Sequence, residues 1–215
     1  MQELSAKQKT VFILDEMITG FRWHLQGAQT LFNVLPDLTT FGKGMANGFS
    51  VAALTGKREI MDLGGIRKEG AERVFLISTT HGAEMPGLAA FVKTMEIYKK
   101  ENVVEHLWSY GKKLTDGINS IAKELAISNY FSAEGFPCSP NYVAKDRTEK
   151  VSLPFRTLFA QEMVKHKVLM PYIALSFSHR NEELEITLQA ARGSLKVYKK
   201  ALEEGVEKYL AGKPI

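Results

Sequence analysis

Cysteine is almost absent from this chain of 215 residues, in which Cys138 is the only one. A single cysteine excludes an intrachain disulfide and a cysteine-rich zinc site, and this usage is typical of a reducing compartment. Long apolar runs are also missing, because the first ten residues are polar and no stretch approaches the roughly 18 apolar residues that span a bilayer. We therefore expect a cytoplasmic protein with neither a signal peptide nor a membrane-spanning segment.

The chain also lacks a block of charge of one sign. Lysine and arginine exceed aspartate and glutamate by 28 − 24 = 4, and the excess is spread along the sequence. Nucleic-acid-binding arms concentrate their basic residues, so no nucleic-acid partner is expected. With 45% hydrophobic residues, 17 glycines and 7 prolines, the composition excludes disordered, collagenous and coiled-coil classes.

Residues 9–57 predict a sheet of short strands separated by glycine-containing loops. The apolar run 11–14 is followed by two acids, Asp15 and Glu16. Such a run is typical of a central parallel strand that is covered on both faces and opens at its carboxyl end. Helices are therefore expected on both sides of the sheet, and the fold class is α/β.

Apolar residues return at helical spacing over residues 86–125, which predicts two helices with a break near Glu101 and Asn102. The remainder predicts a smaller α+β domain. Its expected elements are strands within 127–135 and 140–146, a helix after Pro154, a strand within 168–177 and a last helix at about 181–210. The predicted domains are residues 1–125 and 126–215.

The candidate chemistry lies in the first region. Ligands of open α/β sheets bind outside the carboxyl ends of the strands, which is where Asp15 is expected. Alternatively, one of the two acids caps the next segment and the other is solvated. Lys43 comes 43 − 15 = 28 positions later, between Gly42 and Gly44. It is either a surface lysine in a turn or a ligand-binding one, since small neighbours allow a planar ligand to approach the backbone.

The glycines of residues 42–48 match neither common phosphate-binding loop. Their spacing is one residue too wide for a dinucleotide fingerprint, and the following SVAALTG indicates a strand where that motif needs a helix. The Gly-Lys-Ser/Thr ending of a Walker A loop is absent as well. The run VFILDE does resemble a Walker B strand, so a fragment of a P-loop ATPase remains an alternative.

Several motifs in one order resemble the class III aminotransferases of the pyridoxal-phosphate-dependent fold type I superfamily. They are the strand ending in Asp-Glu, ITGFR at 18–22, GAQ at 27–29, PDLTT at 36–40 and GKG at 42–44. The nearest branch resembles glutamate-1-semialdehyde aminomutase and its relatives. Residues 56–65 are similar to that branch, and residues 77–90 are similar to it more loosely.

The resemblance implies a cofactor, pyridoxal 5′-phosphate, and roles for individual residues. Lys43 would form the Schiff base with the cofactor and move the substrate proton as general acid and base. Asp15 would bind the pyridine nitrogen and keep it protonated, so that the ring accepts electrons. Thr80, or Thr79 by a shift of one register, would reach the cofactor phosphate of the neighbouring subunit. The complete enzyme is therefore expected to be a homodimer.

The substrate side is less well marked. Arg22 either binds a substrate carboxylate with its bidentate fork or forms a structural ion pair. Glu84 belongs to the Gly-Ala-Glu that replaces the Gly-Asn-Pro of the aminomutases, and it is the second candidate for a substrate contact. The five histidines have no metal-binding spacing, so no metal is expected.

The resemblance begins in the middle of the family's cofactor domain and covers only the C-terminal half. The expected fold is thus a partial fold type I transferase, with part of the large-domain mixed sheet, flanking helices and a small C-terminal α+β domain. The missing half would carry the phosphate loop, the stacking aromatic and several strands, and a separate chain could supply it. A sheet without those strands exposes unpaired edges, so the chain alone is expected to be unstable or oligomeric, and inactive.

The predicted function is that of an aminotransferase or aminomutase that moves an amino group from a small donor to an oxo or semialdehyde acceptor. A noncatalytic relic or interaction module of the same fold is the main alternative.

Overall fold

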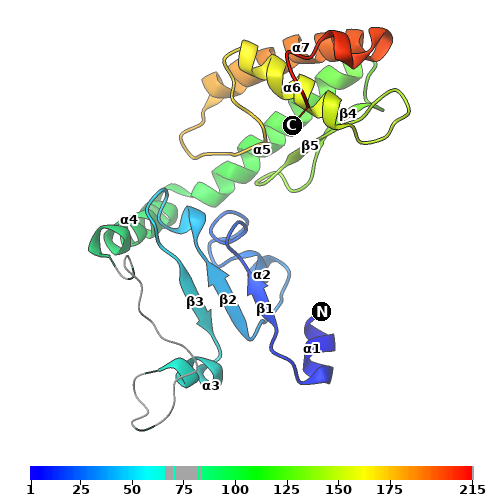
Figure 1. Cartoon of the computed structure of the whole chain (residues 1–215). Helices are drawn as coiled ribbons and strands as arrows, with labels where there is room; N and C mark the ends of the chain where they lie inside the picture. Colours follow the sequence, from blue (N-terminus) through cyan, green and yellow to red (C-terminus); the bar gives the residue numbers. More distant parts are fainter. Residues whose placement is uncertain (66–69, 71–81, 83, 215) are drawn as a thin grey trace. The chain divides into compact units, whose positions relative to one another are not determined.

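Figure 1 shows the computed structural model of the chain, which describes residues 1–65, 70, 82 and 84–214. The chain forms two compact units, Met1–Val104 and Glu105–Ile215. They divide at the first turn of α5 (Val103–Glu124), whereas the sequence places the domain division after this helix. The helix belongs to the second unit because its apolar face is buried there. The functional domains 1–125 and 126–215 stay a prediction.

The first unit is built on a three-stranded sheet of β1 (Ile13–Asp15), β2 (Leu38–Phe41) and β3 (Ala53–Gly56). The strands lie side by side in the order β1-β2-β3 (Figure 1). β1 and β2 are parallel, and Asp15 pairs with Thr40, while β2 and β3 are antiparallel. The predicted mixed sheet is therefore present.

β1 is an edge strand in this sheet, not the covered central strand that its apolar run predicts. Ile13 is 55% exposed and Val11, just before the strand, is 54% exposed. The pairing explains this exposure, because β1 has β2 on one side and no further strand beyond it in the described part of the chain. An apolar edge of this kind is a ready template for another strand.

Short helices and one long helix complete the first unit. They are α1 (Gln2–Gln8), α2 (Ala28–Leu31), η1 (Lys43–Met45), α3 (Arg58–Met61), η2 (Asp62–Gly64) and α4 (Met85–Glu101). α4 joins the sheet through aromatic contacts, since the ring of Phe91 lies 6.2 Å from that of Phe21, which in turn packs against Phe41 at 5.5 Å. Asn102 adopts a left-handed conformation with φ of 50° and ends α4, which confirms the predicted break.

The second unit packs helices against a two-stranded antiparallel sheet. Its elements after α5 are β4 (Phe131–Glu134), β5 (Asn141–Ala144), α6 (Leu153–Lys165), α7 (Asn181–Glu204) and η3 (Val206–Lys208). Four fully buried aromatic residues form its centre: Phe131, Tyr142, Phe159 and Tyr198. The Tyr198 hydroxyl lies within hydrogen-bond reach of the carbonyls of Tyr130 (3.0 Å) and Lys145 (2.6 Å), so burial of this ring is compatible with its polar end. No helix in the described residues is long and apolar enough to cross a membrane.

The strand expected within 168–177 is wrong, because this segment is irregular. The carbonyl of Pro171 in this segment is bonded to side chains. Tyr142 donates its hydroxyl to it (2.9 Å), and Arg156 donates to the same oxygen (3.0 Å). These side chains take the place that a neighbouring strand would have at this carbonyl.

Candidate functional site

Asp15 and Lys43 lie at the same edge of the first unit's sheet. Asp15 ends β1 directly opposite Thr40 of the parallel strand β2, and Lys43 begins η1 two residues after β2 ends. Both side chains are exposed. The parallel register therefore places a carboxylate and a primary amine at the carboxyl ends of adjacent strands, which is the usual position of ligand sites in such sheets.

The Asp15 carboxylate is oriented by two donors. Oδ1 accepts a hydrogen bond from the Met17 amide (2.9 Å) and another from the Thr40 hydroxyl (3.2 Å). Among the described residues both bonds end on this one oxygen. The other oxygen, Oδ2, is therefore available to a donor from outside the chain.

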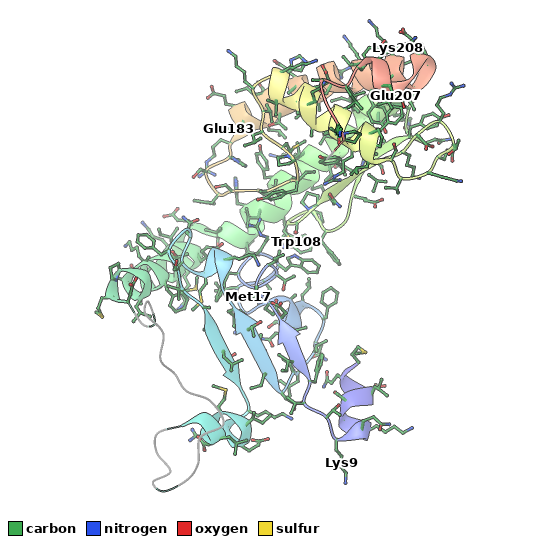
Figure 2. The ribbon with its side chains drawn as sticks, viewed as in Figure 1. Lys9, Met17, Trp108, Glu183, Glu207 and Lys208 are labelled. Atoms are coloured by element: carbon green, nitrogen blue, oxygen red, sulfur yellow. The ribbon has the colours of Figure 1, made fainter. Side chains whose placement is uncertain are left out.

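Lys43 has an unusual backbone for a residue with a side chain. Its φ of 45° lies in the left-handed region, which costs a non-glycine residue on the order of 1 kcal/mol. Gly42 before it is closely packed, because a Cβ there would meet Cε of Met17, labelled in Figure 2, and the methionine side chain would have to move. A Cβ at Gly44 would meet nothing within 4 Å, so this second glycine leaves open space beside the lysine.

Glu16 is fully buried and accounts for the capping alternative weighed in the sequence. Its Oε1 accepts from the amide of Gln29 (2.7 Å), and Oε2 accepts from the amide of Ala28 (2.9 Å) and from the Thr19 hydroxyl. These amides belong to the first turn of α2, so one acid of the pair caps the next helix while Asp15 stays exposed. Gly27 is required here, since its φ is 89° and a Cβ would lie 2.7 Å from Oε1 of Glu16.

The two candidate substrate residues, Arg22 and Glu84, both lie at or near α4. Burial raises the pKa of Tyr98 in α4, and the nearby Arg22 guanidinium offsets part of this increase. Arg22 therefore lies close to α4. Glu84 is exposed and is the N-cap residue of the same helix. Thr79 and Thr80, the expected phosphate contacts, lie outside the described residues.

Thr40 and Met17 are the residues that sequence reasoning missed. Thr40 belongs to the PDLTT motif, but its contact with Asp15 depends on the register of two strands that are 25 residues apart in sequence. No local pattern gives that register. The hydrogen bond from the Met17 amide to Asp15 forms a turn in which an aspartate accepts from the amide two residues later. Such a turn could have been expected from Asp15 alone. Within the described ranges, no group of three His, Cys, Asp or Glu side chains is placed to hold a metal ion.

Comparison with known proteins identifies the family. The family described as "Aminotransferase class-III" matches residues 1–162. A 3-aminobutyryl-CoA aminotransferase of Cloacimonas acidaminovorans is 35% identical over 94% of this chain and 47% of its own length. A glutamate-1-semialdehyde 2,1-aminomutase of Fusobacterium nucleatum is 30% identical over 90% of the chain and 46% of its own length. The chain thus spans about half the length of the curated relatives it matches.

Solved structures agree on the fold. The FumI protein of Sphingopyxis sp. MTA144, in its PLP internal aldimine form, superimposes with a TM-score of 0.80 at 21% identity, over 94% of this chain and 47% of that one. An omega-transaminase from Sphaerobacter thermophilus superimposes with a TM-score of 0.81 at 21% identity, over 92% of this chain and 47% of that one. The partial fold type I architecture is therefore confirmed, and the ATPase alternative is set aside. The chain belongs to the class III aminotransferase family.

Proposed function

We propose that this chain is the C-terminal half of a pyridoxal-phosphate-dependent aminotransferase or aminomutase. The observation that carries the proposal is the parallel pairing of β1 and β2, which brings an oriented carboxylate and an amine to one sheet edge. This donor set fits the cofactor, which has a ring nitrogen to be kept protonated and an aldehyde that condenses with an amine. Lys43 and Asp15 are the residues that would hold it.

When bound, pyridoxal phosphate supplies an electron-accepting ring that stabilises a carbanion at the substrate. Asp15 holds a proton at the ring nitrogen, and its orientation by Met17 and Thr40 aims the carboxylate for that bond. Lys43 would hold the cofactor aldehyde through Nζ, and the same amine would take a proton from the substrate carbon that bears the amino group and return it to another atom of the bound substrate. The open space beside Gly44 leaves room for this movement.

A complementary segment completes the sheet in this proposal. The exposed edge of β1 and the outward apolar residues of α4 support it, since Met85 is 75% exposed and Val92 is 57% exposed. The curated relatives carry about twice the length of this chain. In the assembled protein, meaning this chain with its complementary half, two copies pair so that Thr80 or Thr79 reaches the partner's cofactor phosphate. The cytoplasmic location stays a prediction.

The substrates in this proposal are a small amino donor and an oxo or semialdehyde acceptor. The names of the two curated relatives cover both transfer between molecules and movement within one. The noncatalytic alternative predicts loss of the reactive pair, whereas this chain keeps both Asp15 and Lys43.

Borohydride trapping tests the proposal. The assembled protein is loaded with pyridoxal phosphate, reduced and mapped by mass spectrometry, and the pyridoxyl group is expected on the peptide that contains Lys43. Lys43→Arg should lose the label. Lys57→Arg is the matched control and should keep the label. Nζ of Lys57 pairs with Oδ1 of Asp37 at a distance of 2.6 Å, and this pair lies away from the site. A label on another lysine in the unmodified chain would contradict the assignment.

A further inference from the structure

A buried polar linkage connects the strand of Asp15 with the strand that leads to Lys43. It begins at Glu16, whose carboxylate accepts hydrogen bonds from the amides of Ala28 and Gln29 in α2. It continues through the side chain of Gln29. Oε1 of Gln29 accepts a hydrogen bond from the Thr39 hydroxyl (3.1 Å). Thr39 is buried in the middle of β2, with 3% exposure. The linkage therefore passes from the end of β1 through α2 to β2.

The same linkage closes the loop that orients Asp15. The segment 17–29 leaves β1 and returns to it at α2, where Glu16 holds the amides of Ala28 and Gln29. At the near end of the loop, the Gly20 amide donates to the Glu16 carbonyl (2.9 Å). The Met17 amide, which donates to Asp15, lies inside this closed segment. Its direction consequently depends on how firmly Glu16 holds the loop.

Only a carboxylate can accept every hydrogen bond that Glu16 receives. Both amides are obligatory donors, one facing each oxygen, and the Thr19 hydroxyl donates as well. A carboxamide in this place would point its NH₂ at one amide in either orientation of the group, which leaves a buried donor without an acceptor. The buried position is thus specific for an acid.

We propose that Glu16 is a positioning residue for the reaction. Through Gln29 and Thr39 it fixes β1 against β2, and through the loop it fixes the Met17 amide, so that the Asp15 carboxylate and Lys43 Nζ keep one separation and orientation. This inference rests on the proposed roles of Asp15 and Lys43. Displacement of a catalytic group by about 1 Å lowers rates by about 100-fold, so a device that holds both groups matters for turnover more than for binding.

Three variants separate this role from general stability. Glu16→Gln keeps the shape of the side chain, removes its negative charge and replaces one acceptor oxygen with an NH₂ donor. Thr39→Val removes the hydroxyl at the far end of the linkage while keeping the branched shape, and Thr39→Ser keeps the hydroxyl. Glu3→Gln makes the same chemical change on the exposed face of α1 and is the matched control.

The assembled protein is used for two measurements. Amide hydrogen exchange of the peptide that covers residues 17–29 is expected to accelerate by about 10-fold or more in Glu16→Gln and Thr39→Val, because the loop loses its anchor. In steady-state kinetics these two variants should lower kcat by about 10-fold or more, with KM for the amino donor changed less than about twofold. Thr39→Ser and Glu3→Gln should behave as the wild type in both measurements.

The outcomes distinguish the inference from the proposed function. A wild-type protein that neither transaminates nor labels at Lys43 contradicts the proposed function. An active wild type with unchanged kcat in both Glu16→Gln and Thr39→Val overturns the positioning role, even if exchange accelerates. Equal losses in Thr39→Ser and Thr39→Val, or a rise in KM in place of the fall in kcat, would assign Glu16 to folding alone and overturn the inference as well.

Discussion

At the scale of single residues, two adjacent acids have different positions in the site. Asp15 is exposed and oriented through Oδ1, whereas Glu16 is buried and bonded on both oxygens. Alternation along a strand sends neighbouring side chains in opposite directions, so two acids at a strand end can face a ligand and the protein interior respectively.

The exposed acid gives the first prediction. Asp15→Asn in the assembled protein should still bind pyridoxal phosphate, but kcat should fall by about 100-fold or more, because an amide cannot stabilise a positive ring nitrogen as a carboxylate does. Cofactor content by absorbance and steady-state turnover measure the two effects. Asp116→Asn, at an exposed pair with Lys112 in α5, is the control. Turnover near that of the wild type would remove Asp15 from the mechanism.

His106 gives a prediction about pH. Burial is the main cause that lowers its pKa from the usual 6.5, and the charge of Arg180 adds to this, while a hydrogen bond to the His179 carbonyl works in the opposite direction. The unfolded chain therefore binds more protons than the folded chain once the pH falls below about 6.5. The contribution of His106 to stability is present above that pH and is lost as the pH falls through the folded pKa.

Urea unfolding of the full chain at pH 5 and pH 7.5 measures this effect. His106→Gln should show a smaller difference between the two pH values than the wild type. Ser109→Ala changes an exposed neighbour in the same helix without a titrating group, and its pH dependence should match the wild type. An unchanged pH dependence in His106→Gln would show that this histidine does not contribute.

At the scale of elements, the sequence predicted the features that depend on neighbouring residues and missed those that depend on distant contacts. The break between α4 and α5 at Asn102 was predicted from spacing, and the left-handed residue found there is a local C-cap. Asp15 and Lys43 were singled out from their immediate context of strand end and glycines, and their roles, which the resemblance implies, stay a prediction. The segment 168–177 was predicted wrongly because its apolar pattern fits a strand, while the pairing that makes a strand depends on distant side chains such as Tyr142 and Arg156.

Gly111 in α5 shows how a helix rule can reverse in context. Alanine is better than glycine inside a helix by about 1 kcal/mol, so propensity favours Gly111→Ala. A Cβ at this position would, however, collide with the backbone carbonyl of Pro137. Overpacking of this kind costs about 1–3 kcal/mol or more and backbone cannot rotate away as a side chain can, so the net change should be destabilising.

Gly117→Ala in the same helix is the comparison. There the added Cβ would meet the end of the Leu188 side chain at 2.6 Å, and that side chain can rotate. In thermal or urea unfolding, Gly111→Ala should therefore have a clearly lower free energy of unfolding than Gly117→Ala. The reverse order would mean that the turn at Pro137 yields more easily than Leu188 does.

At the scale of the whole molecule, the sheet of the first unit has an open edge. The described sheet ends at β1 with Ile13 and Val11 exposed. Wild-type chain purified alone should associate with rising concentration, and Ile13→Lys should reduce this, because a charge on an edge strand opposes pairing. Ile18→Lys replaces an equally exposed residue, 58% against 55%, in the loop after the strand, and it is the control for sedimentation velocity. Equal effects of both lysines would argue against association through the edge.

Cofactor retention is the second prediction at this scale. Purified alone, the chain should lose pyridoxal phosphate on dialysis and show no turnover, whereas the assembled protein should keep both. Firm binding needs several oriented phosphate donors and a sandwiched ring, and two residues at one sheet edge do not provide them. Transient colour from any accessible lysine is expected in both samples. A yellow, transaminating preparation of this chain alone would contradict the proposal that it is a half.

The left-handed backbone of Lys43 also sets stability against the proposed chemistry at this position. Glycine or asparagine would occupy φ of 45° with less strain, by on the order of 1 kcal/mol for glycine. Lys9 and Lys167 adopt the same conformation, at φ of 54° and 64°, and glycine would relieve their strain in the same way. Selection of the chain for thermal stability alone would therefore favour glycine at all three positions, and at position 43 it would remove the amine on which the proposed reaction depends.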